Sequence, residues 1–175
     1  MSRPFWPNPN PCNLTDTGLE VPPMLERYLN TALIRPDLSA TSRDDVIREV
    51  AAVIGGGCSG LSVDKIANSL KEREDIDSTG IEEGIAIPHA KVDGLAELTV
   101  AICRSKAGVD FGAHDNRPTR LFFVLLAPIG AAGEHMKVLA RMAKVLSVPG
   151  LKEKLLEAKD AEEMYRAVIK AEKEL

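Results

Sequence analysis

Cysteine is scarce in this sequence, and the three cysteines present form neither a disulfide framework nor a metal-ligand motif. Cys12, Cys58 and Cys103 are odd in number and far apart in a chain of 175 residues. Small oxidised domains use paired cysteines, whereas thiols stay reduced in the cytoplasm. The cysteine content therefore predicts a cytoplasmic protein without structural disulfides.

Long apolar runs and an excess of basic residues are also missing. No run approaches the roughly 20 apolar residues that span a bilayer, and the N-terminal residues lack the apolar core of a signal peptide. The net charge is −4 and the pI about 5.5. Charge of this sign attracts neither nucleic acid nor an anionic membrane. We therefore expect no nucleic-acid partner and no direct membrane insertion.

Proline is concentrated at the N-terminus and divides the chain into two parts. Residues 1–23 hold six of the 11 prolines, and such a segment neither continues a helix nor donates a full set of strand hydrogen bonds. We expect a flexible arm there, whose role the sequence leaves open. The whole chain is 45% hydrophobic and 27% charged, which suits one domain with a buried core over residues 24–175.

Beyond the arm, helical and strand patterns alternate, which is typical of a layered α/β domain. Helices are predicted over residues 23–30, 42–54, 62–74, 134–146, 151–158 and 161–171. Strands are predicted over residues 31–34, 85–87, 98–103 and 121–127. The last strand, LFFVLLA, has the composition of an interior strand covered on both faces.

The helix at 134–146 has an apolar stripe that predicts its buried face. The stripe consists of Met136, Leu139, Ala140, Ala143 and Leu146.

The stretch from Arg73 to Lys91, REDIDSTGIEEGIAIPHAK, combines several side chains that carry chemistry. Its punctuation predicts a loop that leads through a brief strand to His89. Pro88 fixes its own φ and restricts Ile87 to extended conformations, so the imidazole leaves the strand end on a stiff backbone. We interpret His89 as a nucleophile that carries a phosphoryl group.

Two further histidines and the arginine each have a structural interpretation as well as a chemical one. His114 lies in a polar turn and is interpreted as structural. His135 lies in the first turn of a predicted helix, where an anion is favoured, although taken alone it reads as a solvated surface histidine. Arg73 in a last helical turn complements the helix dipole without any further role.

Together these residue types fit phosphoryl transfer. Its loose transition state spreads charge over the phosphoryl oxygens, so the protein mainly positions groups and neutralises charge. A histidine nucleophile, a guanidinium, hydroxyl donors and a helix N-terminus are suitable for this. Neither a metal nor another cofactor is required when the donor is a phosphohistidine.

The stretch STGIEEGIAIPHAK, preceded by Arg73-Glu74, resembles the active-site signature of type 2 IIA domains of the bacterial phosphotransferase system, the fructose, mannitol and nitrogen-regulatory class. The resemblance continues through GVDFGAHDNRPTRLFFVLLAP and EHMKVLARMAKVL, from about Leu25 to the C-terminus. It implies a single-domain α/β sandwich, with a mixed sheet flanked by helices. It also implies a phosphotransferase in the sugar transport system.

Carried over by position, the resemblance implies roles for six residues. His89 is the phosphorylated residue, His135 steadies the phosphoryl group, and Arg73 neutralises its charge. Glu83 falls where some members have an acid. Ser78 and Thr79 match the Ser-Thr-Gly of the motif and either bind phosphate or form an ordinary turn. Ala90 departs from the glycine that many members have after the histidine, and we expect its methyl group to narrow access without stopping transfer.

Three functions compete at this stage. In the first, the protein accepts phosphate from the histidine-containing phosphocarrier protein and passes it to a IIB component. In the second, a nitrogen-regulatory type, phosphorylation changes the binding of a regulatory protein target; the lack of a permease or IIB segment in the chain favours it. The third is a metal site on His89, His135 and Glu83, which has no short ligand spacing to support it. The sequence names no sugar and no oligomeric state.

Overall fold

The most apolar segment of the chain lies inside the sheet. It forms β5 (Thr119–Pro128), in which every residue from Leu121 to Ala127 is buried, as predicted for an interior strand. The other strands are β1 (Ile34–Arg35), β2 (Ile85–Ala86), β3 (His89–Val92) and β4 (Thr99–Val109). β4 pairs with β5 in antiparallel fashion, whereas the other pairings (β1 with β4, and β2 and β3 with β5) are parallel. The sheet is therefore mixed, as expected.

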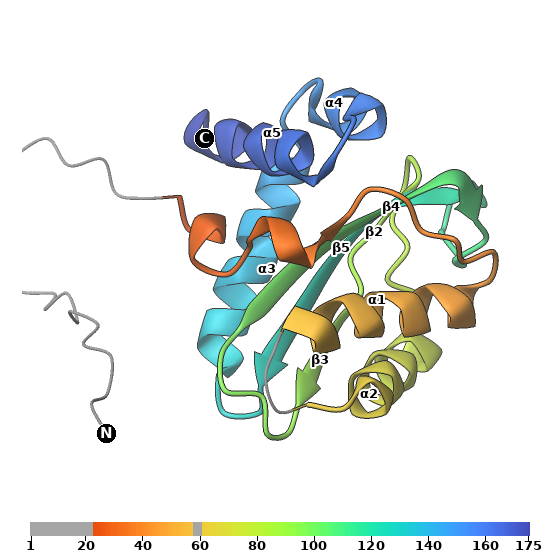
Figure 1. The fold of residues 1–175 in the computed structure, drawn as a ribbon, viewed down its shortest axis with the longest axis vertical. Helices are drawn as coiled ribbons and strands as arrows, with labels where there is room; N and C mark the ends of the chain where they lie inside the picture. The colour runs from red at the N-terminus through yellow and green to blue at the C-terminus, as the bar shows by residue number, and fades with distance from the viewer. Residues whose placement is uncertain (1–22, 58–60) are drawn as a thin grey trace, which may run out of the picture.

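Helices cover both faces of this sheet in the computed structural model, which describes residues 23–57 and 61–175 (Figure 1). The helices are α1 (Arg43–Gly57), α2 (Val63–Ile76), α3 (Ala132–Leu146), α4 (Leu151–Glu157) and α5 (Ala161–Lys173), with short 3-10 turns η1 (Leu25–Arg27) and η2 (Thr31–Leu33). Figure 1 shows the pair α1 and α2 on one side of the sheet and α3 with α5 on the other. The predicted α/β architecture is confirmed.

The predicted N-terminal arm lies outside the described residues except for Pro23. Within the described residues, no helix is both long and apolar enough to cross a membrane.

A two-residue interruption separates β2 from β3 and fixes the place of His89. Ile85 lies opposite Leu121 of β5, and His89 lies opposite Leu125, so the two short strands follow the same path along β5. Pro88 has no N–H to donate, but its carbonyl accepts the N–H of Leu125 at 2.9 Å. His89 is therefore the first residue of a second short edge strand, β3, whereas the sequence predicted that it follows the end of the strand at 85–87.

The buried face of α3 differs from the prediction by one position. The structure buries His135, Val138, Met142 and Val145, whereas Met136 of the predicted stripe is 62% exposed. Two interleaved sets of residues in this helix have helical spacing, and one of them includes a histidine. Packing against β5 selects that set, so a residue interpreted as solvated is buried.

Only the 3-10 turn η1 forms within the helix predicted over residues 23–30, and three element boundaries also differ. Residues 31–34 were predicted to be a strand, but η2 occupies most of them because the side chain of Asn30 accepts the N–H of Ala32 and caps a turn. α1 continues through the glycines to Gly57 instead of ending at residue 54.

The third boundary is the end of β4, which continues beyond residue 103 to Val109. It carries the buried Arg104, whose guanidinium donates to the carbonyls of Pro36, Leu155 and Ala158. An arginine with these hydrogen bonds can lie inside a sheet, which the apolar pattern could not indicate.

Candidate active site

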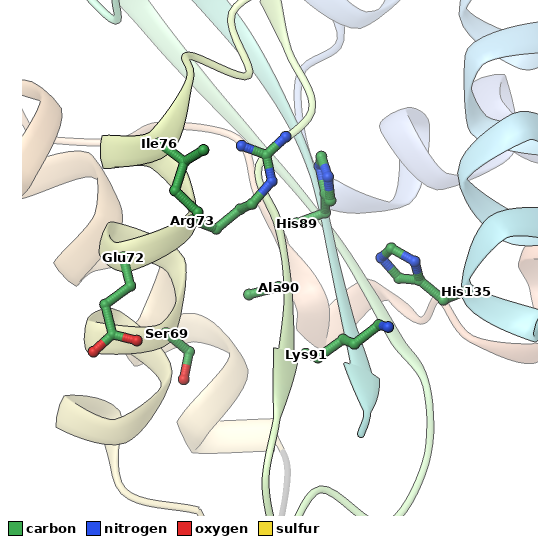
Figure 2. A pocket seen from close by; sticks show the side chains of 8 residues that line it. All are labelled: Ser69, Glu72, Arg73, Ile76, His89, Ala90, Lys91 and His135. Atoms are coloured by element: carbon green, nitrogen blue, oxygen red, sulfur yellow. The ribbon is translucent and has the colours of Figure 1, made fainter. Parts of the chain in front are cut away.

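A hollow of about 390 Å³ opens where the edge strand β3 passes between α2 and α3 (Figure 2). It is lined by Ser69, Glu72, Arg73, Ile76, His89, Ala90, Lys91 and His135. Three of the six predicted site residues therefore meet here, although 62 positions separate the first from the last. Figure 2 shows His89 between Arg73, which comes from α2, and His135, which comes from α3.

The ring of His89 is held in one tautomer. Its Nδ1 lies 2.8 Å from the carbonyl oxygen of Ile87. Because a carbonyl can only accept, Nδ1 carries the proton, and Nε2 of the neutral ring is left with its lone pair. The side chain is half-buried on the wall of the hollow. The arrangement provides an imidazole nitrogen that can act as a nucleophile.

His135 is the second ring of the site and is 7% exposed. Its ring centroid lies 5.7 Å from that of His89, with the planes tilted by 44°. Burial, followed by the electrostatic influence of the neighbouring His89 and Lys91, lowers the pKa of His135 below its ordinary value. Its Nε2 is buried and has no hydrogen-bond partner among the described residues. A neutral ring with an unsatisfied nitrogen can bond to a group that enters the hollow.

Arg73 supplies the positive charge on the opposite side of His89. It lies in the last turn of α2, as predicted, and is half-buried. Its Nη1 donates to the carbonyl of Asp77 at 3.0 Å, which fixes the guanidinium at the end of the helix. Figure 2 shows this group extending from α2 toward His89. A guanidinium held in this way can bind phosphoryl oxygens through its other N–H groups.

Ser78 and Thr79 do not line the hollow. Both hydroxyls donate to the buried carboxylate of Glu74, and the Ser78 hydroxyl also lies 2.9 Å from the carbonyl of Phe111. Hydroxyls engaged in this way hold the loop in place. The contacts support the turn-forming alternative that the sequence left open for these two residues.

Glu83 lies in a different groove from the two histidines. Its carboxylate is 3.6 Å from the ammonium of Lys152, and its backbone N–H donates to Asp115. The groove of about 460 Å³ that it lines also contains His114. The three ligands of the metal alternative therefore do not converge, and the described residues contain no cluster of three histidine, cysteine or acidic side chains suited to a metal ion.

Lys91 and Glu74, which both act on the site, were not singled out from the sequence. Lys91 lines the hollow and acts electrostatically on His135. Alternation along β3 could have indicated it, since residues two apart in a strand point to the same side. Glu74 accepts hydrogen bonds from Ser78 and Thr79 of the loop. Its position next to Arg73, in a helix with buried residues, was the only signal in the sequence that could have indicated it.

Comparison with known proteins agrees with this geometry. Residues 27–171 match the family described as "Phosphoenolpyruvate-dependent sugar phosphotransferase system, EIIA 2". The chain belongs to this family. IIA domains of this system are phosphotransferases in its phosphoryl relay.

The proteins similar to this chain have names that refer to different functions, sugar transport and nitrogen regulation. The chain is 41% identical to a fructose-specific EIIA component of Haloferax volcanii over 54% of its own length and 62% of that relative. It also resembles the crystal structure of the nitrogen regulatory protein IIA-Ntr from Neisseria meningitidis. There the TM-score is 0.77 and the identity 33%, over 83% of this chain and 99% of the other.

A third likeness concerns the fold alone. The IIA mannitol enzyme of Escherichia coli, solved in complex with phosphorylated IIB mannitol enzyme, matches with a TM-score of 0.68 and 20% identity. The match covers 80% of this chain and 96% of the other.

Proposed function

We propose that this EIIA 2 protein is a phosphocarrier that accepts a phosphoryl group on Nε2 of His89. The donor is the histidine-containing phosphocarrier protein, and the acceptor is a IIB component. The observation that supports this most strongly is the hydrogen bond from Nδ1 of His89 to the carbonyl of Ile87. It leaves one ring nitrogen with a free lone pair beside a guanidinium and a second, neutral ring.

The transfer step exchanges one P–N bond for another. The lone pair of His89 Nε2 forms a bond to phosphorus while the donor's P–N bond breaks, and that electron pair returns to the donor ring. A donor ring protonated on its other nitrogen becomes a neutral imidazole. The His89 ring keeps its Nδ1 proton and carries the positive charge, which the carbonyl dipole of Ile87 stabilises. No proton needs to leave the site.

Arg73 and His135 stabilise the transferred group from two sides. The guanidinium neutralises the charge that spreads over the phosphoryl oxygens. His135 has a lowered pKa and is therefore uncharged at neutral pH, so it offers one N–H without adding a positive charge that would hold the phosphoryl group too tightly. Glu83, which is paired with Lys152, stays a prediction without a contact to this hollow.

The regulatory role is the second candidate and uses the same chemistry. The solved nitrogen regulatory protein IIA-Ntr is similar to 83% of the chain, whereas the fructose-specific component aligns with 54%. A phosphoryl group adds about two negative charges at pH 7, which suffices to exclude an acidic or apolar partner from the surface around His89.

A transfer assay tests the proposal and separates the two outputs. The protein is incubated with phosphoenolpyruvate, the enzyme that phosphorylates the phosphocarrier protein, and the phosphocarrier protein itself. Phosphate should appear on the protein, and its rapid passage to a sugar-specific IIB component would support transport. Phosphorylation without transfer to any IIB component would support regulation. No phosphorylation at all would contradict both.

A further inference from the structure

Glu74 is a buried carboxylate to which the transfer step gives no role. It lies in the last turn of α2, next to Arg73, and is only 3% exposed. A negative charge at the C-terminal end of a helix opposes the helix dipole, and a buried carboxylate is costly unless it is hydrogen-bonded. Its place is therefore unfavourable unless its partners compensate for it.

These partners come from the loop that leads to His89. Oε1 of Glu74 accepts the backbone N–H of Thr79 at 2.9 Å and the hydroxyl of Ser78 at 3.0 Å, and Oε2 accepts the hydroxyl of Thr79. Hydrogen bonds to an ionised acceptor are roughly twice as strong as those between neutral groups. The carboxylate thus fastens the beginning of the loop to the end of α2.

From Thr79, two further hydrogen bonds reach the ring of His89. The carbonyl of Thr79 accepts the N–H of Ile87 at 3.0 Å, and the carbonyl of Ile87 accepts Nδ1–H of His89 at 2.8 Å. The loop is also close to its neighbour on the other side, since a Cβ on Gly80 would lie 2.9 Å from Cα of Ala113. The position of the Ile87 carbonyl therefore depends on where Thr79 is held.

We propose that Glu74 is a positioning residue for the nucleophile. Through Thr79 and Ile87 it keeps His89 in the tautomer that leaves Nε2 unprotonated. Without this support the Ile87 carbonyl shifts relative to the ring, and the other tautomer, whose Nε2 carries the proton and cannot attack, becomes populated. The catalytic importance of Glu74 rests on the proposed function. The tautomer of His89, however, can be measured in the unphosphorylated protein.

Glu172 provides a matched control. It is the other acidic side chain among the buried residues of the described chain, 1% exposed, and it lies in α5. It accepts the backbone N–H of Leu25 at 2.9 Å and Nε of Arg141 at 2.7 Å. Its removal should lower stability as the removal of Glu74 does, because both leave buried donors unsatisfied. It should not affect the ring of His89.

The test is ¹⁵N NMR of the imidazole nitrogens at pH 8, combined with the rate of phosphorylation. Wild type and Glu172→Ala should show His89 with the proton on Nδ1 only. Glu74→Ala should show both tautomers and be phosphorylated about tenfold more slowly, since a displacement of about 1 Å can cost up to roughly 100-fold in rate. Glu74→Gln should restore both properties, because its amide oxygen can still accept the N–H of Thr79.

A folded Glu74→Ala protein with His89 protonated on Nδ1 only would overturn the proposal, as would a Glu74→Gln protein that behaves like Glu74→Ala. A changed tautomer in Glu172→Ala would overturn it too, because lost stability would then be the cause. If Glu74→Ala does not fold, Glu74→Asp, whose carboxylate is one methylene further from Thr79, replaces it with the same opposed outcomes. Failure of wild type to be phosphorylated on His89 would contradict the proposed function and leave the tautomer result standing.

Discussion

Two hollows of the molecule contain histidine and charged residues, and only one has the features of an active site. The first contains Arg73, His89 and His135, and its second histidine has a buried nitrogen without a partner. The second contains Glu83 and His114, where the carboxylate forms an ion pair with a lysine and the imidazole is exposed. Reactive side chains must converge, and each must keep a lone pair or hydrogen-bonding group that no other residue occupies. Proximity in sequence achieves neither, since Glu83 is only six residues from His89.

Removing His89 from the first hollow and His114 from the second should have the most unequal effects. His89→Ala should lower phosphorylation by the phosphocarrier protein by at least about 1,000-fold, because the nucleophile is gone. His114→Ala, the matched histidine of the second groove, should be phosphorylated at the wild-type rate. The measurement is incorporation of labelled phosphate over time. Label on His89→Ala would show that another residue is the nucleophile, and its loss from His114→Ala would give the second hollow a role in the reaction.

The charge on the first hollow is tested by Arg73→Gln. We expect phosphorylation to slow by about 100-fold, the usual order for the loss of one group that stabilises transition-state charge. Arg166→Gln is the control, because Arg166 pairs with Glu162 on the surface of α5. The initial rates of the two variants should therefore differ from each other by about the same factor. Equal rates would remove Arg73 from the mechanism.

His135→Ala should separate uptake of the phosphoryl group from its onward transfer. The variant should still be phosphorylated but should pass the group on about tenfold more slowly, the order expected for losing one hydrogen bond to a charged group. His135→Asn, which keeps an N–H donor, should recover part of the rate. Single-turnover transfer from the isolated phosphorylated protein measures this step. An onward rate equal to that of wild type would contradict the role of His135.

The buried ring should also make stability depend on pH. Because the folded state has a lowered pKa at His135, the unfolded chain binds the proton first as pH falls below the ordinary value of about 6.5. Stability contributed by the neutral ring is therefore present at pH 8 and is lost toward pH 5.5, by at most about 1.4 kcal/mol per pH unit. Urea unfolding of wild type and His135→Asn at the two pH values measures this. An equally steep loss in the variant would show that other groups cause it.

Much of the fold, and the central place of His89 in the site, could be predicted from the sequence. The run at 121–127 indicated the interior strand, and Pro88 indicated the stiff backbone before His89. Packing decided what the sequence could not. It chose between two apolar registers in α3 and so buried His135, which had looked solvated. It also gave the hydroxyls of Ser78 and Thr79 to Glu74, a partner from the preceding helix that no local pattern indicates.

The hydrogen bond to the carbonyl of Ile87 leaves Nε2 of His89 unprotonated, so that Nε2 is the atom that bonds to phosphorus. One measurement tests this directly. The protein is phosphorylated by the phosphocarrier protein, labelled with ¹⁵N in its histidines, and studied by ³¹P and ¹⁵N NMR under alkaline conditions in which phosphohistidine persists. We predict a single phosphohistidine, at position 89, with phosphorus bonded to Nε2. Phosphorus on Nδ1 of His89, or on any other residue, would contradict the account.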